Sequence, residues 1–408
     1  MRYLLLLLPL LAACASVPKG EAPQAAAPVS DVDRIVRDLC GKQVALLGEE
    51  AHHGSGRTVT FKVELVRRLV EECQFDAFFI EAGTYDFVNI AERLKAGEPV
   101  GEAMVATAIG GLWAHQEMAP LVPFLTQRLN AGTLVAGGLD DQLNRDTYAH
   151  RQMTSELLPL LEGARREACG EELERYMGWR YDDAHPYTVD TVGRVRGCFR
   201  EMASALSRPR AAGGPRTQGY LQMVHSLDRF FERQAAGFSQ ASEKGRGGRD
   251  WTAYNGRARS MFTNLEWHLA QSPRPRKAIV WLATIHAAKD FRALDGDLRE
   301  AVPFGSFVQA RFGADAFVLG FSAHAGSYAP VSNKRTQVLE PARADSLEGW
   351  AFSGQATETR YLDASQLRDL GPRAARPISY AWMTGPWATV MDGLLVFREE
   401  SPPNALVR

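Results

Sequence analysis

A group of ionisable side chains follows a short apolar run near the start of the chain. The run Val44–Leu47 leads into the segment 48–54, which reads Gly-Glu-Glu-Ala-His-His-Gly. A histidine with an ordinary pKa of about 6.5 can take a proton from water, and a carboxylate beside it fixes its tautomer and stabilises its charged form. His52, paired with Glu49 or with Glu81, therefore predicts a site that activates water.

Other polar side chains follow further apolar runs. Glu81, Asp140 and His286 each come at the end of a run typical of a buried strand. Because ligands bind outside the carboxyl ends of parallel strands, these side chains are expected to lie beside His52. His286 is expected to share the role of base or to donate a proton. Arg57 is expected either to stabilise negative charge on a reacting oxygen or simply to open the next helix at the surface.

The spacing of apolar residues predicts an α/β fold with a mostly parallel sheet flanked by helices. Helical periodicity over 58–72 and around 118–129 alternates with strand-like runs, the pattern of a sheet covered on both faces. The strand-like runs are 44–47, 77–80, 134–136, 278–283, 316–321 and 394–397. A large helical insertion at about 144–270, with a Gly-rich charged loop at 237–250, interrupts a single domain that spans 31–408.

The N-terminus has the pattern of an export signal. Arg2 precedes a leucine run, and the segment Leu-Ala-Ala-Cys ends at Cys14. The apolar run is too short to span a bilayer stably, and small residues precede the cysteine. Residues 1–14 therefore predict a bacterial lipoprotein signal with lipidated Cys14, or alternatively an ordinary cleaved signal. Residues 15–30 predict a flexible tether, and the expected location is the periplasmic face of the outer membrane if the cell has two membranes.

The remaining cysteines and the overall composition narrow the class of protein. Cys169 and Cys198 are close in sequence and are the better disulfide candidates in an oxidising compartment, whereas Cys40 and Cys73 are either a second pair or two buried thiols. The chain is 45% hydrophobic and 23% charged, which is typical of a globular protein. Its formal net charge of -1 gives no basic surplus, so nucleic acid is not an expected partner.

These motifs resemble those of the erythromycin esterase family. Segment 48–54 is similar to a G-E-x-x-H-G pattern, with Glu49 and His52 in register and His53 as an extra residue before the glycine. The other similar positions are Lys62 before an amphipathic helix, Glu81 in FIEAGTYD, Trp113 and Glu117 in a W-x-x-x-E helix, Asp140 and Gln142 in a G-x-D-x-Q strand end, Arg257 in an R-x-x-x-M-x-x-N helix, and His286 in a W-x-x-N-x-H segment where Thr284 replaces the asparagine.

The resemblance implies a hydrolase that cleaves a small carboxylic ester or lactone with a histidine-activated water. It implies catalytic roles for Glu49, His52, Glu81 and His286. Supporting or substrate-binding roles fall to His53, Arg57, Trp113, Glu117, Asp140, Gln142 and Arg257. No cofactor is expected, although a divalent metal is possible. The alternatives are a metal-dependent hydrolase or peptidase, a haem- or metal-binding lipoprotein on the same scaffold, and a catalytically silent scaffold.

Overall fold

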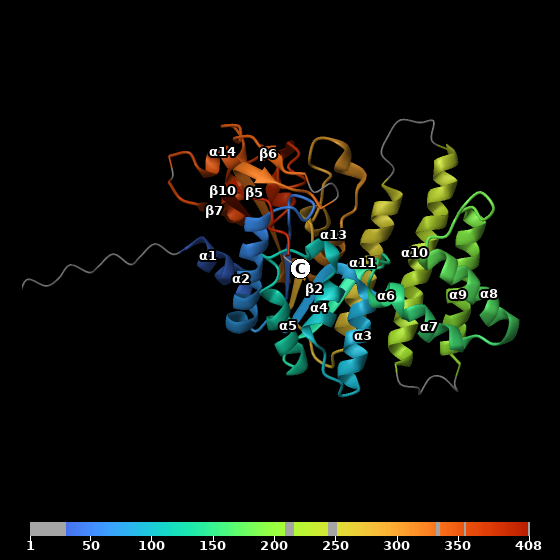
Figure 1. Cartoon of the computed structure of the whole chain (residues 1–408). Coiled ribbons are helices and arrows are strands. Elements are labelled where there is room, and N and C mark those ends of the chain that lie inside the picture. The colour runs from blue at the N-terminus through green and yellow to red at the C-terminus, as the bar shows by residue number, and fades with distance from the viewer. Residues whose placement is uncertain (1–29, 209–215, 244–250, 332–334, 355, 407–408) are drawn as a thin grey trace, which may run out of the picture.

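The structure is a computed structural model that describes most of the chain. The described ranges are 30–208, 216–243, 251–331, 335–354 and 356–406, with the side chains of 238–243 left out (Figure 1). The predicted lipidation site Cys14, the signal and nearly all of the tether lie outside these ranges. Within them, no helix has the length and apolar character needed to cross a membrane.

A mostly parallel sheet forms the centre of the molecule. Its parallel strands are β1 (Val44–Leu47), β2 (Ala77–Gly83), β3 (Val135–Asp140), β4 (Ala278–Trp281), β5 (Ala316–Tyr328) and β10 (Gly393–Glu400). The strand order is β3-β2-β4-β1-β5-β10-β7, where β7 (Thr359–Leu362) runs antiparallel beside β10 and β6 (Gln337–Leu339) pairs antiparallel with β5. A separate pair consists of β8 (Arg373–Ala375) and β9 (Met383–Gly385). The predicted α/β class is confirmed.

Helices cover both faces of the sheet because alternate strand residues point to opposite sides. Ala45 and Leu47 belong to one apolar core, and Val44 and Leu46 belong to the other. The first face packs against α1 (Asp31–Cys40), α2 (Gly56–Cys73), α4 (Glu102–Ile109) and α5 (Leu121–Asn130). The second face packs mainly against α11 (Thr252–Ala270) and α13 (Phe304–Phe312). The shorter helices that matter below are α12 (Thr284–Ala287), α14 (Leu347–Ala351), α15 (Ala364–Asp369) and the 3-10 turn η1 (Gly111–Trp113).

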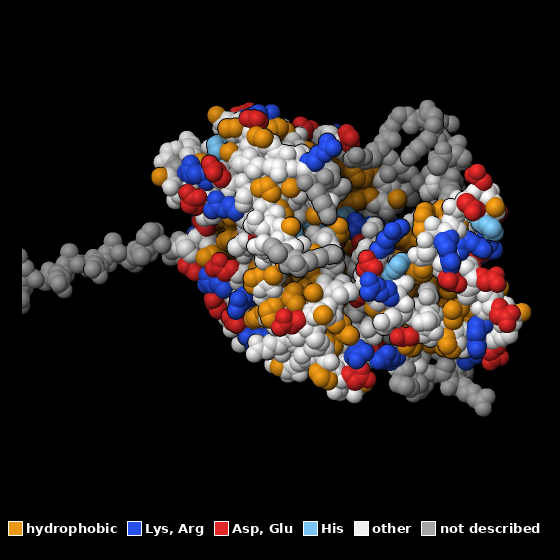
Figure 2. All heavy atoms as spheres, in the orientation of Figure 1, with side chains coloured by type: hydrophobic (Ala, Val, Ile, Leu, Met, Phe, Trp, Pro, Cys, Tyr) orange, Lys and Arg blue, Asp and Glu red, His pale blue; other side chains and the backbone are white. Residues whose placement is uncertain are grey.

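The chain between β3 and β4 forms a helical lobe with its own core. The lobe contains α6 (Tyr148–Arg151), α7 (Met153–Leu157), α8 (Gly163–Met177), α9 (Val189–Leu206) and α10 (Thr217–Glu243), and it packs on α3 (Thr84–Lys95). In Figure 1 it lies at the end of the molecule away from α1 and α2. Figure 2 shows acidic and basic side chains mixed over its visible surface, without a patch of one sign.

One boundary of this lobe differs from the sequence prediction. Residues 237–243, expected to begin a loop, continue α10 as far as Glu243. This stretch contains a single glycine, Gly237, and the glycine cluster begins only at Gly245. One glycine in a helix costs roughly 1 kcal/mol, which a long helix with a packed face can absorb.

Two disulfides fasten helices to one another. Cys169 in α8 is bonded to Cys198 in α9, and Cys40 at the end of α1 is bonded to Cys73 at the end of α2. The sequence allowed Cys40 and Cys73 to be either a disulfide or two buried thiols, and the structure has them as a disulfide. One bridge therefore lies in the helical lobe, and the other lies beside the sheet.

Candidate functional site

Four neighbouring strands deliver ionisable side chains to one edge of the sheet. Asp140 ends β3, Glu81 lies near the end of β2, His286 follows β4, and His53 follows β1. The strands β3, β2, β4 and β1 are adjacent in this order, so their carboxyl ends lie side by side. All four residues are buried or nearly buried. They form a compact polar cluster where a parallel sheet usually binds its ligand.

Arg257 of α11 is the hub of this cluster. Its Nη2 donates to Glu81 Oε1 at 2.9 Å, and its Nε donates to Asp140 at 3.2 Å. Its Nη1 contacts His286 Nε2 at 2.9 Å. The backbone N–H of Ala283 donates to the other Glu81 oxygen at 2.9 Å. Burial opposes ionisation of Glu81, but His286 and Arg257 outweigh it and hold the pKa of Glu81 well below its usual range.

The contacts of His286 fix its tautomer. A guanidinium can only donate, so His286 Nε2 must accept from Arg257, and the ring proton of neutral His286 lies on Nδ1. Nδ1 is buried and has no hydrogen-bond partner among the described residues. The ring stacks on Tyr254, with centroids 5.2 Å apart and planes 15° apart. Burial lowers the pKa of His286 to about 4 against the opposing effect of Glu81, so the ring is neutral at neutral pH.

A tight turn after β1 presents His53. Glu49 accepts hydrogen bonds from the backbone N–H of Ala51 at 2.9 Å and of His53 at 2.7 Å. His52 and His53 both have positive φ angles, 49° and 67°, a conformation rarely adopted by residues other than glycine. A Cβ on Gly54 would lie 2.3 Å from the carbonyl oxygen of Ala329, so only glycine fits there. The turn is therefore held by Glu49 and by close packing against the end of β5.

His53 occupies the place that the sequence assigned to His52. Its Nδ1 lies 3.4 Å from Glu49 Oε2, and its ring packs on Trp113 with centroids 4.2 Å apart. Burial alone would lower the pKa of His53, but the neighbouring carboxylates of Glu49 and Glu81 outweigh it and raise the pKa above its ordinary value. His53 is thus the buried histidine of this turn that is paired with a carboxylate.

The expected pairing of His52 with Glu49 is wrong. The side chain of His52 is exposed, and its Nε2 lies 2.9 Å from Ser379 Oγ. Two successive left-handed residues turn neighbouring side chains in different directions, which separates the two histidines. When the G-E-x-x-H-G pattern is anchored at Gly54, Glu50 and His53 come into register, but Glu49 then stands at the first glycine of the pattern. Each alignment leaves one glycine of the pattern unmatched, so the pattern does not choose between the two histidines.

Arg57 does not point into the cluster. Its Nη1 donates to the carbonyl of Glu399 at 3.0 Å and lies 3.5 Å from Glu358, and its guanidinium stacks over Phe397. The expected role in stabilising an oxyanion is therefore not supported by its position. Arg57 opens α2 at the surface, which is the other reading of the sequence.

The predicted W-x-x-x-E helix is also absent. Trp113 ends the 3-10 turn η1, and Glu117 lies in the following turns. Trp113 packs in the cluster, whereas Glu117 accepts hydrogen bonds from the backbone and side-chain nitrogens of Asn404. Of this pair, only Trp113 belongs to the site.

Two further predicted positions are near the cluster. Gln142 donates its backbone N–H to Asp140 at 3.3 Å and lines the cavity beside Arg257. Thr284, which replaces the usual asparagine, is buried, and its backbone N–H donates to the carbonyl oxygen of Glu49 at 2.7 Å. Thr284 therefore ties the loop after β4 to the loop after β1.

Two further carboxyl groups, those of Glu50 and Glu400, meet at Thr58 next to the His53 turn. The hydroxyl of Thr58 lies 2.9 Å from Glu50 Oε1 and 2.9 Å from Glu400 Oε2. Tyr380 donates its hydroxyl to the same Glu50 oxygen at 2.8 Å. Burial and the charge of Glu49 raise the pKa of Glu50 to about 7, and burial and the charge of Glu50 raise the pKa of Glu400 to about 8. Glu400 is thus a buried member of the site region that was not predicted from the sequence.

A cavity of about 540 Å³ opens onto Arg257 from the helical lobe. Its lining residues are Gln142, Phe230, Arg233, Gln234, Gly237, Ala253, Tyr254 and Arg257. The guanidinium of Arg233 is already paired with Asp141. The lining thus combines aromatic rings, amides and arginines that have carboxylate partners, and the lobe supplies one wall.

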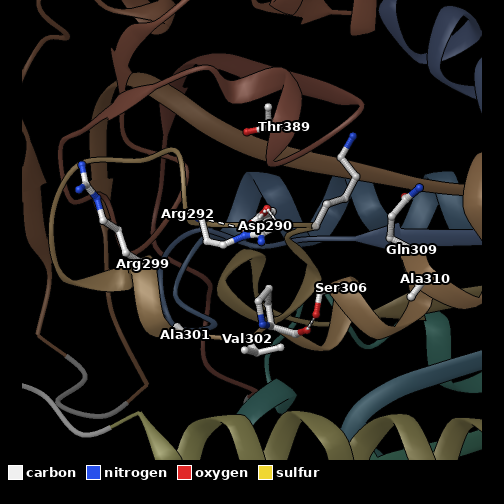
Figure 3. A pocket seen from close by; sticks show the side chains of 11 residues that line it. Asp290, Arg292, Arg299, Ala301, Val302, Ser306, Gln309, Ala310 and Thr389 are labelled. Carbon is white, nitrogen blue, oxygen red and sulfur yellow. Dashed lines mark hydrogen bonds and ion pairs between the residues drawn. The ribbon is translucent and has the colours of Figure 1, made fainter.

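A cavity of about 610 Å³ lies elsewhere (Figure 3). Its cationic side chains have partners: Lys289 Nζ lies 2.7 Å from Asp392, and Arg292 lies 2.7 Å from Asp290. None of the residues that the sequence assigned to the site lines it. In the described part of the chain, no group of three or more His, Cys, Asp or Glu side chains is arranged to hold a metal ion.

Comparison with known protein folds places this chain among solved structures of low sequence identity. A succinoglycan biosynthesis protein has a TM-score of 0.67 at 16% identity, with 93% of this chain and 94% of that chain covered. A Bacillus cereus protein has a TM-score of 0.67 at 14% identity, with 94% of both chains covered. A mutant of the erythromycin esterase EreC in its open conformation has a TM-score of 0.63 at 17% identity, with 92% of this chain and 95% of that chain covered. At these identities the likeness shows the fold alone.

Comparison with protein families identifies the chain more closely. No curated protein matches it significantly. The family model described as erythromycin esterase matches residues 70–391, a range that begins after the turn bearing His53 and includes Glu81, Asp140, Arg257 and His286. Because this match covers well over half of the sequence, the chain belongs to the erythromycin esterase family, and this membership supports a hydrolase.

Proposed function

We propose that the protein hydrolyses a small carboxylic ester or lactone with a water molecule activated by His53. The observation that carries the proposal is the opposite tuning of two histidines at one sheet edge. The pKa of His53 is raised beside Glu49, whereas the pKa of His286 is lowered to about 4 beside Arg257. Environments that push two titratable groups apart in this way are typical of acid–base sites.

His53 suits the role of base. The carboxylate of Glu49, 3.4 Å from Nδ1, favours a proton on Nδ1, which leaves the basic lone pair on Nε2. In the proposed reaction Nε2 takes a proton from water, and the resulting hydroxide oxygen bonds to the carbonyl carbon. The carbon–oxygen bond to the leaving group then breaks, and His53 returns its proton to the alkoxide. The products are a carboxylic acid and an alcohol, or a hydroxy acid if the substrate is a lactone.

Arg257 and His286 suit the role of stabilising the oxyanion. One Nη1 hydrogen of Arg257 is used by His286, which leaves the second without an assigned acceptor among the described residues. The ring of neutral His286 keeps a proton on Nδ1. Preformed donors of this kind stabilise the negative charge that develops on the carbonyl oxygen. Glu81 and Asp140 hold the guanidinium in place.

The experiment is a hydrolysis assay against a panel of esters and lactones with two matched variants. His53→Gln is expected to lower kcat on the order of a hundredfold or more, the usual scale for a general base. His52→Gln changes the adjacent, exposed histidine and is expected to keep most of the activity. Loss in His52→Gln with full activity in His53→Gln would reverse the assignment.

The same assay tests the metal-dependent alternative. Activity is expected to survive dialysis against a chelator. Loss on chelation with recovery on adding a divalent ion would reassign His53 and its neighbours as ligands.

We also propose that the protein is exported and anchored through lipidated Cys14. The Leu-Ala-Ala-Cys sequence after the leucine run supports this assignment. The site would then face the compartment outside the inner membrane, where a small ester or lactone can reach it.

A further inference from the structure

Lys62 of α2 is a lysine buried without a hydrogen-bond partner. Its side chain is 0% exposed, and its Nζ has no acceptor among the described residues. Helical periodicity alone would place Lys62 on the polar face of α2, so its burial needs a reason. An ammonium group without acceptors in the interior is costly unless other charges compensate it.

The ammonium is held between aromatic rings and carboxylates. Nζ lies 4.1 Å from the ring centroid of Trp281 and 5.7 Å from that of Trp113. The negative charges of Glu49, Glu50 and Glu81 favour the protonated form of Lys62. A desolvated cation over an indole face is attracted by the negative face of the ring.

Trp113 connects Lys62 to His53. The Trp113 ring contacts Lys62 Nζ and also the His53 ring, whose centroid lies 4.2 Å away. These two distances place Nζ within about 10 Å of the His53 ring centroid. Nothing charged on Lys62 reaches the cavity surface, so it acts on substrate only through its neighbours.

We propose that Lys62 is a positioning residue for the reaction, whose buried ammonium keeps the neighbouring His53 ring in the neutral form that can accept a proton from water. The inference rests on the proposed role of His53 as base. Glu49 and Glu81 make His53 more basic, and Lys62 opposes them. Without Lys62, His53 would bind a proton more tightly and would be inactive as a base over a wider range of pH.

Other titratable groups near His53 and Lys62 also affect the pKa values of these two residues. Five titratable groups face His53 or Lys62. They are Glu49 and Glu50 after β1, Glu81 in β2, His115 after η1 and His286 in α12. Burial lowers the pKa of both His115 and His286, so both rings are uncharged at neutral pH. Burial lowers the pKa of Lys62 to about 7, so its charge is present below neutral pH and is lost above it.

The test is the pH profile of kcat/KM between pH 5 and 9 for charge-removing and charge-keeping variants. A unit charge within about 10 Å in a protein interior shifts a pKa by roughly one unit. Lys62→Met is therefore expected to move the acid limb up by about one pH unit, with a five- to tenfold loss at pH 6 and little change at pH 8. Lys62→Arg is expected to keep the limb in place.

A matched control is Lys277→Met. Lys277 also lies over an aromatic ring, 4.6 Å from the centroid of Phe75, but it immediately precedes β4, at the end of that strand away from the cluster. The control is expected to leave the acid limb where it is. An equal shift in the control, or no shift in Lys62→Met, would overturn the inference.

A measurement without substrate separates this inference from the proposed function. The His53 ring is followed by NMR titration, with His53→Gln to assign its signal, in wild type and in Lys62→Met. An upward shift of its midpoint supports the role of Lys62 even if no ester is hydrolysed. An unchanged midpoint in an active variant overturns that role and leaves the hydrolase proposal intact.

Wild-type protein provides the test if Lys62→Met does not fold. The Cε signal of Lys62 is then titrated in the unmodified chain. A midpoint near neutrality, accompanied by an inflection in the His53 curve, is expected. A midpoint near the ordinary value of about 10.4, or a His53 curve without inflection, would overturn the inference.

Discussion

The shared contact of Glu50 and Glu400 with Thr58 predicts a loss of stability at alkaline pH. One hydroxyl hydrogen cannot donate to two carboxylates, yet Thr58 Oγ1 lies 2.9 Å from each. One of the two carboxyl groups must therefore carry a proton and donate it to the hydroxyl. Glu400 is the better holder, because burial and the charge of Glu50 raise its pKa to about 8.

The sign of the effect follows from proton linkage. A carboxyl group with a folded pKa of about 8 and an ordinary pKa of 4.5 binds its proton more tightly in the folded protein. Its contribution is complete at pH values below 4.5 and is lost as the pH rises through 8. Between pH 6 and pH 9 one such group would lose about 2 to 3 kcal/mol of unfolding free energy. Glu50, with a pKa of about 7, acts in the same direction.

The perturbation is Glu400→Gln, which imitates the protonated side chain. The amide oxygen can still accept from the backbone N–H groups of Arg57 and Ser401, and the amide nitrogen can donate to Thr58. The variant is expected to lose markedly less stability than wild type between pH 6 and 9. Glu399→Gln, on the same strand but exposed, is the matched control and should behave as wild type.

The assay is urea unfolding followed by tryptophan fluorescence at pH 6, 7, 8 and 9. The compared quantity is the change in unfolding free energy from pH 6 to pH 9. Equal losses in wild type and Glu400→Gln would refute the shared proton.

Three further predictions concern other parts of the molecule. Asp140→Asn should lower kcat at least tenfold with little change in Tm, because it removes one of the two carboxylates that orient Arg257; steady-state kinetics and a thermal melt check this. Replacing both Cys169 and Cys198 by Ala should cost roughly 3 to 4 kcal/mol, the chain-entropy value for a loop of this size, and denaturant unfolding measures it. Cys14→Ser should abolish incorporation of a fatty-acid probe in cells, and equal labelling of the variant would contradict lipidation.

The sheet was predictable because its central strands are short apolar runs between helices. Val44–Leu47 and Ala278–Trp281 are buried on both faces, and such strands read as continuous apolar segments. Strand β7 was not predicted, since Thr359–Leu362 contains an arginine and lies at the sheet edge beside β10. Edge strands carry a weaker apolar signal because part of their surface meets solvent.

The choice between His52 and His53 could not be made from local sequence. It depends on two left-handed residues and on packing of Gly54 against Ala329, a contact with a distant part of the chain. The convergence of Glu81, Asp140 and His286 was predictable, because each follows a strand. Their common partner Arg257 was predictable only from the family motif, since its helix gives no indication of which side chain faces the sheet edge.

The burial of Lys62 and Glu400 could not be predicted from the sequence either. A charged residue in an amphipathic helix or at a strand end is normally assigned to the surface. Both are buried because other charges, aromatic rings or hydroxyl groups surround them in the folded chain. Those partners come from distant segments, and no local pattern identifies them.

The strand order has a consequence for when the candidate site forms during synthesis. Leu47 pairs with Trp281, about 230 positions later in the chain. Strand β5 pairs with β10, which lies near the end of the described chain. Contacts this distant give a high contact order and slow assembly. The helical lobe, with its own core and disulfide, can form while the chain is still growing. The His53 turn, in contrast, lacks its support until Glu400 has been synthesised. A nascent or prematurely ended chain would therefore carry a folded lobe beside a His53 turn that still lacks its supporting carboxyl group.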